Sequence, residues 1–248
     1  MSNMIMKAEQ KNGRTILTEC CFSAPMKIAR PFYHDDFTEV MVMSASAGFL
    51  EGDRYDISMS LTEHASLKLT GQSYTKVFRA SQYGAVQNMK VTMKNNSTLA
   101  CLLPPIIPFS GSMFRNQVEI HLECGCQLLL CEIISCGRIG MGERFAWKKL
   151  QTRTIVYQDD IPVFLDSQML LPHHNSCSGI GFFEGHTHIG TIYTYGAEDA
   201  VLPDQFIASK TRAAKGMCIR ILADSTEEIL SCLSKINFTG GYLSWLAF

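Results

Sequence analysis

The 248-residue sequence has no long apolar run, no cluster of basic residues and few charges of either sign. No segment approaches the roughly 20 apolar residues that a membrane helix needs, and residues 1–14 hold no apolar stretch of signal-peptide length. Lysine and arginine total 22 against 23 acidic residues, so the formal net charge is -1 and no strong field attracts a polyanion. We therefore expect a cytoplasmic protein that binds neither a membrane nor nucleic acid.

The sequence also lacks the short motifs that mark common enzymes. It has no G-x-x-x-x-G-K-[ST] phosphate loop, no G-x-S-x-G nucleophile elbow and no H-E-x-x-H metal motif. The stretch EIISCGRIGMGERF, residues 132–145, carries three glycines, but their spacing is G-x-x-G-x-G and not the G-x-G-x-x-G of a dinucleotide-binding loop. The residues that follow end in a β-branched and aromatic cluster typical of a strand, where such a loop requires a helix. These glycines need another explanation.

The chain has enough apolar material for a large buried core. Hydrophobic residues make up 46% of it and charged residues 18%, which argues against disorder. Most of the ten cysteines lie inside apolar runs such as QLLLCEII, where a free thiol behaves as a small hydrophobic side chain. Cys124, Cys126, Cys131 and Cys136 lie close together but lack the second pair of a zinc ribbon. We interpret the cysteines as reduced thiols of an intracellular protein.

Short runs of alternating or β-branched residues recur about every 10 to 15 residues, separated by turns rich in glycine, asparagine and acidic residues. This pattern is typical of an antiparallel, mainly β protein, and we expect one large domain over residues 1–248 with a β-sandwich or β-helicoidal, solenoid-like core. The runs are RTILTECC, TEVMVMSA, RYDISMSL, ASLKLT, VQNMKVTM, STLACLL, QVEIHLE, QLLLCEII and TIVYQ.

One or two short helices are expected near the C-terminus. Ser225 and Glu228 form a capping-box pattern, and the apolar residues that follow recur at helical spacing. A second short helix is expected in PDQFIASKTRAAK, residues 203–215. The fold prediction is therefore mainly β with one or two C-terminal helices.

Histidine pairs are the first candidates for a metal site. If GHTHIG is extended, His186 and His188 point to the same face and can share a metal with a carboxylate such as Glu184. The alternative is two ordinary polar side chains on the solvated face of a strand, because an H-x-H pair needs a third ligand. A second group stands in the loop LPHHNSCSG, where the alternative is a surface turn; it consists of His173, His174 and Cys177.

The segment SAGFLEGDRYDI, residues 46–57, places a carboxylate in a glycine-flanked turn between two strand patterns. Gly52-Asp53 suits a plain hairpin connection. The alternative is that the tight turn holds Asp53 as a buried or cleft-facing carboxylate. The pattern alone leaves both interpretations open.

Five segments, in this order along the chain, resemble blocks of the urease accessory protein UreD family, also called UreH. The segments are SAPMKIARPFY, SAGFLEGDRYDI, TGQSYTKVFR, PPIIPFSGS and EIISCGRIGMGERF. The second matches an S-x-G-x-x-x-G-D block, and the last matches an E-[IL]-x-x-x-G-R-x-x-x-G-E signature. The similarity covers about residues 15–170 and is specific because several blocks agree together. Two departures are Ala47-Gly48 in place of a paired glycine, and an apolar end, TGGYLSWLAF, in place of the basic, proline-containing tail of many members.

The resemblance implies a mostly β, helicoidal fold and a non-enzymatic role. Members of this family bind the accessory protein UreF and, through it, the GTPase UreG, and the complex docks on apo-urease and delivers nickel through a water-filled passage. For this chain the resemblance implies a chaperone in metallocentre assembly with no tightly bound cofactor and with nickel only in transit. The glycines of GRIGMGE would then shape a turn that carries Arg138 and Glu143, because only glycine adopts positive φ without a Cβ penalty.

We predict a nickel-insertion scaffold that is not an enzyme, with a UreF-like protein, a UreG-like GTPase and apo-urease as partners. The residues predicted to act in metal transit or binding are Asp53, Arg138, Glu143, His186 and His188. Carboxylates suit transit because nickel binds imidazole tightly and a conduit must release its cargo. The alternative for the charged turn residues is a structural ion pair. The alternative for the whole chain is a small β metalloenzyme with a metal site at His186 and His188.

Overall fold

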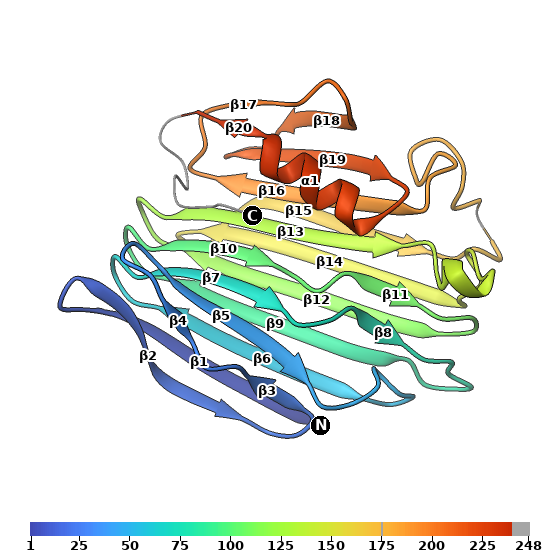
Figure 1. Ribbon diagram of the computed structural model, residues 1–248, viewed down its shortest axis with the longest axis horizontal. Helices are drawn as coiled ribbons and strands as arrows, with labels where there is room; N and C mark the ends of the chain where they lie inside the picture. The colour runs from blue at the N-terminus through green and yellow to red at the C-terminus, as the bar shows by residue number, and fades with distance from the viewer. Residues whose placement is uncertain (175, 240–248) are drawn as a thin grey trace.

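The computed structural model describes residues 1–174 and 176–239, and their strands form two large sheets that lie face to face (Figure 1). The apolar tail discussed above lies outside the described residues from position 240 onward. The seven-stranded sheet has the order β15-β14-β12-β9-β6-β1-β2, and the main path of the eleven-stranded sheet has the order β18-β19-β16-β13-β10-β7-β5-β3. A two-stranded sheet joins β17 to β20. The prediction of a mainly β, sandwich-like or helicoidal fold is confirmed.

The strand bounds are as follows. The seven-stranded sheet contains β1 (Ser2–Lys11), β2 (Arg14–Phe22), β6 (Arg54–Leu61), β9 (Ala85–Met93), β12 (Met113–Leu122), β14 (Lys149–Gln158) and β15 (Ile161–Leu170). The eleven-stranded sheet contains β3 (Met26–Ile28), β4 (Phe32–Tyr33), β5 (Thr38–Ser44), β7 (Ser66–Gly71), β8 (Thr75–Val77), β10 (Thr98–Leu102), β11 (Ile106–Pro108), β13 (Gln127–Ser135), β16 (His188–Tyr195), β18 (Ile207–Arg212) and β19 (Met217–Ala223). The small sheet contains β17 (Ala200–Val201) and β20 (Asn237–Phe238).

The interior strands run parallel, which corrects the prediction of an antiparallel protein. Strands β1, β6, β9, β12 and β14 pair in parallel one after another, as do β5, β7, β10 and β13. Antiparallel pairs occur toward the ends of the sheets, for example β1 with β2 and β14 with β15. Alternation shows only that one face of a strand is buried. Alternation gives no information about where the chain goes after each strand. Here most of the turns lead to the opposite sheet, so the chain winds as the coils of a solenoid.

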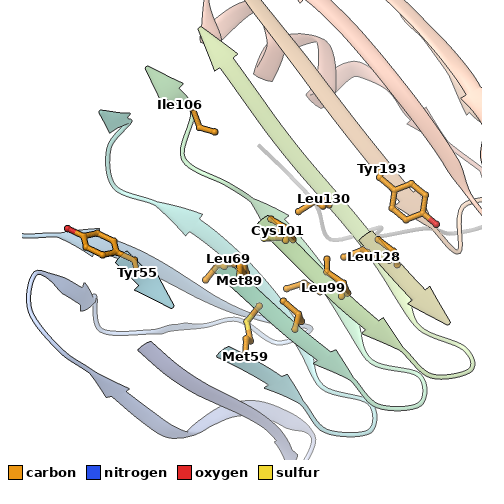
Figure 2. Packing of buried hydrophobic residues seen from close by; sticks show 14 of the residues in the cluster. Tyr55, Met59, Leu69, Met89, Leu99, Cys101, Ile106, Leu128, Leu130 and Tyr193 are labelled. Carbon is orange, nitrogen blue, oxygen red and sulfur yellow. The ribbon is translucent and has the colours of Figure 1, made fainter. Parts of the chain in front are cut away.

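Two apolar cores result from this arrangement. The larger core fills the space between the sheets; Figure 2 shows Met59 and Met89 of one sheet near Leu99 and Leu128 of the other. The smaller core lies under the helix α1 (Thr226–Lys235), which covers the outer face of the eleven-stranded sheet. Strand β13 is buried on both faces, which accounts for its almost continuous apolar run.

The cysteines in the described residues are all free. Six are buried, and burial raises the pKa of the Cys131 thiol to about 12, so these thiols are unreactive parts of the cores. Cys20, Cys21 and Cys124 are exposed. The interpretation as reduced thiols therefore fits the structure, although the apolar-run argument applies only to the buried ones.

Helix α1 is confirmed, and the second predicted helix is wrong. The Oγ atom of Ser225 accepts a hydrogen bond from the backbone N–H of Glu228 at 3.1 Å, as the capping pattern predicts. The segment 203–215 contains no helix; its residues Ile207–Arg212 form β18, an edge strand paired antiparallel with β19. Tertiary pairing here overrides a local helical pattern that has no apolar face. No helix in the described part of the chain is long and apolar enough to cross a membrane.

The turn between β13 and β14 explains the glycines of the sequence GRIGMG. Gly137 has φ +131°, and a Cβ atom there would lie 2.7 Å from the carbonyl oxygen of Glu143. Gly142 ends the 3-10 turn η1 (Ile139–Met141) with φ +73° in the left-handed region. Gly140 has neither constraint, because a Cβ atom would meet nothing within 4 Å. Two of the three glycines are thus required by backbone geometry.

This difference gives a stability prediction. Gly137→Ala should lower the free energy of unfolding by roughly 1 to 3 kcal/mol, because it combines an unfavourable φ with a clash against backbone. Gly140→Ala is the matched control and should leave stability unchanged or slightly raised. Thermal or urea melts of the two variants measure the difference, and equal melting temperatures would contradict the assigned turn geometry.

Candidate functional site

Four of the five family-like segments meet at one end of the sandwich. The segment after β5 approaches β8 so closely that Phe49 N–H donates to the Lys76 carbonyl oxygen at 2.8 Å and Phe49 bridges Val77. Strand β8 pairs with β11, and β11 pairs with β13, which leads into the glycine turn. Gly48 permits this approach, since a Cβ atom would lie 2.5 Å from the same carbonyl oxygen. Segments far apart in sequence thus build one continuous surface.

Arg138 and Glu143 form an ion pair across the glycine turn. The Arg138 Nε atom donates to Glu143 Oε2 at 2.9 Å, and a second guanidinium N–H donates to Oε1. The same carboxylate accepts the backbone N–H of Ser110 at 3.1 Å, and the guanidinium lies 4.2 Å from the centre of the Phe109 ring. The bond to Arg138 lowers the pKa of Glu143. This geometry fits the structural interpretation of the pair, and a role in metal transit stays a prediction.

Asp53 holds its own turn. Its Oδ2 atom accepts the backbone N–H of Leu50 at 2.8 Å, and its own N–H donates to the Leu50 carbonyl oxygen at 3.1 Å. The turn is not a hairpin connection, because it leads from β5 in one sheet to β6 in the other. Asp53 is half-buried. Its transit role also stays a prediction.

The two histidines of GHTHIG have different surroundings. Strand β16 begins at His188, so the same-face argument for an extended segment does not apply to His186, whose Nδ1 atom lies 3.5 Å from Asp224 Oδ1. The Thr187 hydroxyl donates to the Asp224 carbonyl oxygen, so the His188 Nδ1–H must donate to Thr187 Oγ1, at 2.8 Å. Burial lowers the pKa of His188, which favours the neutral ring.

The described residues contain no group of three or more His, Cys, Asp or Glu side chains placed to hold a metal ion. His173 and His174 are exposed in a turn, and Cys177 is buried with a pKa raised by desolvation. The predicted metal role of the histidines is therefore left without a visible third ligand in the part of the chain that the structure describes.

Sequence reasoning missed a buried glutamate between the sheets. Glu132 of β13 is only 6% exposed, and its Oε1 atom accepts a hydrogen bond from Asn116 Nδ2 of β12 at 2.7 Å. The Oδ1 atom of Asn116 in turn accepts from Gln87 Nε2 of β9 at 3.1 Å. Burial raises the pKa of Glu132 to about 7. The glutamate thus joins the two sheets by a polar contact inside the apolar core.

Polar residues continue on the other side of Glu132. Thr191 of β16 stands opposite Glu132, and Arg220 of β19 stands opposite Thr191. The guanidinium of Arg220 donates to Thr191 Oγ1 at 2.6 Å and to Asp166 Oδ1 of β15 at 2.7 Å. We call this row the polar line; it consists of Gln87, Asn116, Glu132, Thr191, Arg220 and Asp166.

Each end of the polar line borders a surface pocket. Gln87 lines a pocket of about 160 Å³ together with Tyr55 and the segment 46–49. Arg220 lines a cleft of about 520 Å³ between the edge strands β15 and β18, with Leu170 and Ile207 as apolar walls. Polar side chains therefore cross the interior from one opening to another.

One signal could have pointed to this row. Glu132 is the single charge in the apolar run QLLLCEIIS, and Asn116 and Gln87 take inward positions in otherwise alternating strands. A charged residue is almost never fully buried unless it has a partner, so Glu132 should have been singled out on burial grounds. The row offers carboxylate, amide and hydroxyl oxygens as possible metal ligands and contains no activated nucleophile. It therefore suits weak contact with a cation better than catalysis.

The raised pKa of Glu132 predicts a pH-dependent stability. The folded pKa of about 7 lies above the ordinary value, so the folded state holds the proton more tightly, and stability falls as pH rises from about 4.5 to 7. Glu132→Gln keeps an acceptor for Asn116 and removes the titration. Its stability relative to the parent should therefore rise between pH 5 and pH 8, by at most about 3 kcal/mol.

Melting curves at several pH values measure the difference in stability between Glu132→Gln and the parent. Glu119→Gln is the matched control on the outer face of the other, seven-stranded sheet, because bonds to His121 and Lys90 lower the pKa of Glu119. As pH rises, the stability of Glu119→Gln relative to the parent should change in the opposite direction or not at all. Parallel pH profiles for the parent and Glu132→Gln would contradict a protonated buried carboxyl.

Comparison with known proteins identifies the family. The family model of the UreD urease accessory protein matches residues 2–239. The urease accessory protein UreD of Acetivibrio thermocellus is 36% identical over 95% of this chain and 95% of its own length. That of Lachnoclostridium phytofermentans is 30% identical over 91% and 88%, and the urease accessory protein UreH of Helicobacter acinonychis is 28% identical over 91% and 89%. The predicted resemblance is confirmed and extends well beyond residues 15–170: the chain belongs to the UreD family of urease accessory proteins, which are helpers and not catalysts.

Proposed function

We propose that this protein is the nickel-guiding subunit of a urease-maturation complex, in which it binds a UreF-like protein and, through it, a UreG-like GTPase before docking on apo-urease. Nickel is cargo in this proposal and passes through the protein without a resident site. The observation that carries the proposal is the polar line, which crosses an apolar core between two surface pockets. The free thiols of the cores agree with a cytoplasmic location.

The energetic argument starts from the cost of the polar line. Apolar side chains packed between the sheets would need no hydrogen-bond partner, whereas a buried carboxyl loses its hydration and leaves a penalty that the bond to Asn116 offsets only in part. A structural role alone is therefore a weak reason for a row of six polar residues. A path for a hydrated cation gives each of them a use.

The chemistry of the row suits passage better than storage. Carboxylate, amide and hydroxyl oxygens bind nickel more weakly than imidazole or thiolate does, so an ion held by Glu132 can leave again. Arg220 already has Asp166 as its counter-charge, which leaves Glu132 as the carboxyl of the row without a cation bonded to it. An arriving divalent cation can take that place.

Asp53, Arg138 and Glu143 belong to the same proposal as residues that shape the opening beside Gln87. Their bonds to Leu50 and Ser110 hold the two turns at this end of the sandwich. We expect Asp53→Ala and Glu143→Ala to assemble with the partners and to activate urease poorly, with partial rescue by excess nickel. Failure to assemble would assign these residues to structure alone.

The direct test uses Glu132→Gln in the complete complex. The variant should assemble with the UreF-like and UreG-like proteins and with apo-urease, as measured by size-exclusion chromatography. Urease activity after activation should fall severalfold at limiting nickel and approach the parent value when nickel is raised, because a neutral amide attracts a cation less strongly than a carboxylate.

Glu119→Gln serves again as the control, since Glu119 faces outward from β12 and lies apart from the polar line. It should activate like the parent at every nickel concentration. Normal activation by Glu132→Gln at limiting nickel would remove the polar line as the route.

A further inference from the structure

The cleft between β15 and β18 contains a carboxylate that the polar line does not use. Glu184 lines this cleft together with Arg220, and its side chain is exposed. The Glu184 Oε1 atom accepts the backbone N–H of Gly181 at 2.9 Å, and in the described part of the chain no cation forms an ion pair with this carboxylate. We considered Glu184 as a ligand that shares a metal with the histidine pair; the fold places it in the cleft that Arg220 lines.

The backbone holds Glu184 in this position. Its φ of +49° lies in the left-handed region, which few residues other than glycine adopt. Gly181 and Gly185 on either side of it have φ +82° and +87°. The N–H of Glu184 donates to the carbonyl oxygen of Gly179 at 3.3 Å. A turn of defined geometry therefore presents the carboxylate to the cleft.

Arg220 closes the outer end of the polar line in this structure. Its guanidinium is bonded to Thr191 and to Asp166, and because β19 and β15 belong to different sheets, the ion pair with Asp166 bridges the two sheets. The second carboxylate oxygen of Asp166 accepts a hydrogen bond from Gln168 Nε2 at 3.0 Å. A cation that arrives beside Thr191 therefore meets a positive charge, and the carboxylate beyond it is already neutralised.

The cleft gives the guanidinium room to turn away from Asp166. The Arg220 side chain is 34% exposed, and the cleft beside it has a volume of about 520 Å³. Leu170, Phe183 and Leu222 are apolar parts of its wall. Among the described residues that line the cleft, Glu184 is the acidic one. Arg220 thus has one carboxylate partner on the route and a second one off the route.

We propose that Arg220 is a gate residue with two positions: bonded to Asp166 it closes the outer end of the polar line, and turned to Glu184 it leaves Asp166 free to contact the departing cation. The guanidinium exchanges one carboxylate for another, so neither position leaves it without a counter-charge. A divalent cation beside Thr191 repels the guanidinium and attracts Asp166, which favours the open position. The inference rests on the proposed function for the identity of the cation, whereas the two positions rest on the cleft itself.

The kinetic test uses the complete complex with the UreF-like and UreG-like proteins, loaded with nickel in the absence of apo-urease. Loss of nickel to a chromogenic chelator measures how readily the ion escapes. Arg220→Gln should speed this loss by about tenfold, the effect expected when one charged hydrogen bond is removed. Arg220→Lys keeps the charge and should restore most of the parent rate. In a Glu132→Gln background the acceleration should disappear, because nickel no longer reaches the outer end.

Glu184→Gln tests the open position. It removes the charge that receives the guanidinium in the cleft, so nickel loss should become severalfold slower than in the parent. Glu198→Gln is the matched control, because Glu198 is also exposed but lines a different cleft, beside Lys210 and Arg212. It should lose nickel at the parent rate. Parent-like rates for both Arg220→Gln and Glu184→Gln would overturn the gate.

A crystal structure of Asp166→Asn gives a second measurement that requires neither nickel nor a change at Arg220. The substitution removes the charge that holds the closed position and keeps the shape of the side chain. The guanidinium should therefore turn into the cleft and bond to Glu184. A guanidinium that still contacts position 166 and stays away from Glu184 would overturn the two-position mechanism.

The outcomes separate this inference from the proposed function. If Asp166→Asn moves the guanidinium to Glu184 while Glu132→Gln activates urease normally at limiting nickel, the two positions of Arg220 stand and the nickel route falls. If Glu132→Gln activates poorly while Arg220→Gln and Glu184→Gln lose nickel at the parent rate, the route stands and the gate is excluded.

Discussion

The hydrogen bond between Asn116 and Glu132 is the contact on which the interior of this protein depends. It is a polar bond from one sheet to the other, within a core of methionine, leucine and isoleucine side chains. Loss of either partner leaves a buried group without its bond, which costs more than the bond itself contributes. The position of Asn116 fixes Glu132, Glu132 faces Thr191 across the sheet, and Arg220 follows from there. The pairing register of β13, β16 and β19 therefore determines where the two ends of the polar line lie.

Local patterns were sufficient for the parts of the fold that depend on local physics. The nine strand patterns all fall on strands, and α1 was found because its cap and its apolar spacing lie within a dozen residues. Parallel pairing could not be seen, because β12 lies between β9 and β14, each reached only after the chain has passed through the other sheet. The segment that became β18 shows the same limit: its partner β19 decides its conformation, and its own sequence does not.

The candidate site divides in the same way. Arg138 and Glu143 are close in sequence on a turn whose glycines were visible, so their proximity was predictable. Glu132 begins the same stretch but was hidden by its apolar neighbours. Its partner Asn116, and the pair Arg220 and Asp166 farther along the polar line, come from three other strands. A buried charge indicates that partners exist without saying where they are. The cleft that Arg220 lines depends on still more distant segments, because it forms only where the solenoid brings β15 of one sheet next to β18 and β19 of the other.

Strand reversal at the ends of the two sheets limits how far this solenoid can grow. A stack of parallel coils presents a free edge at each end, and such an edge is a template for pairing with another molecule. Here β2 turns back along β1, and β18 turns back along β19, so the last strand at each of these edges runs against the direction of the coils. The exposed Lys210 and Arg212 on β18, and Arg14 and Glu19 on β2, place charges on those edges. These charges oppose pairing of the two edges with the sheet of another molecule.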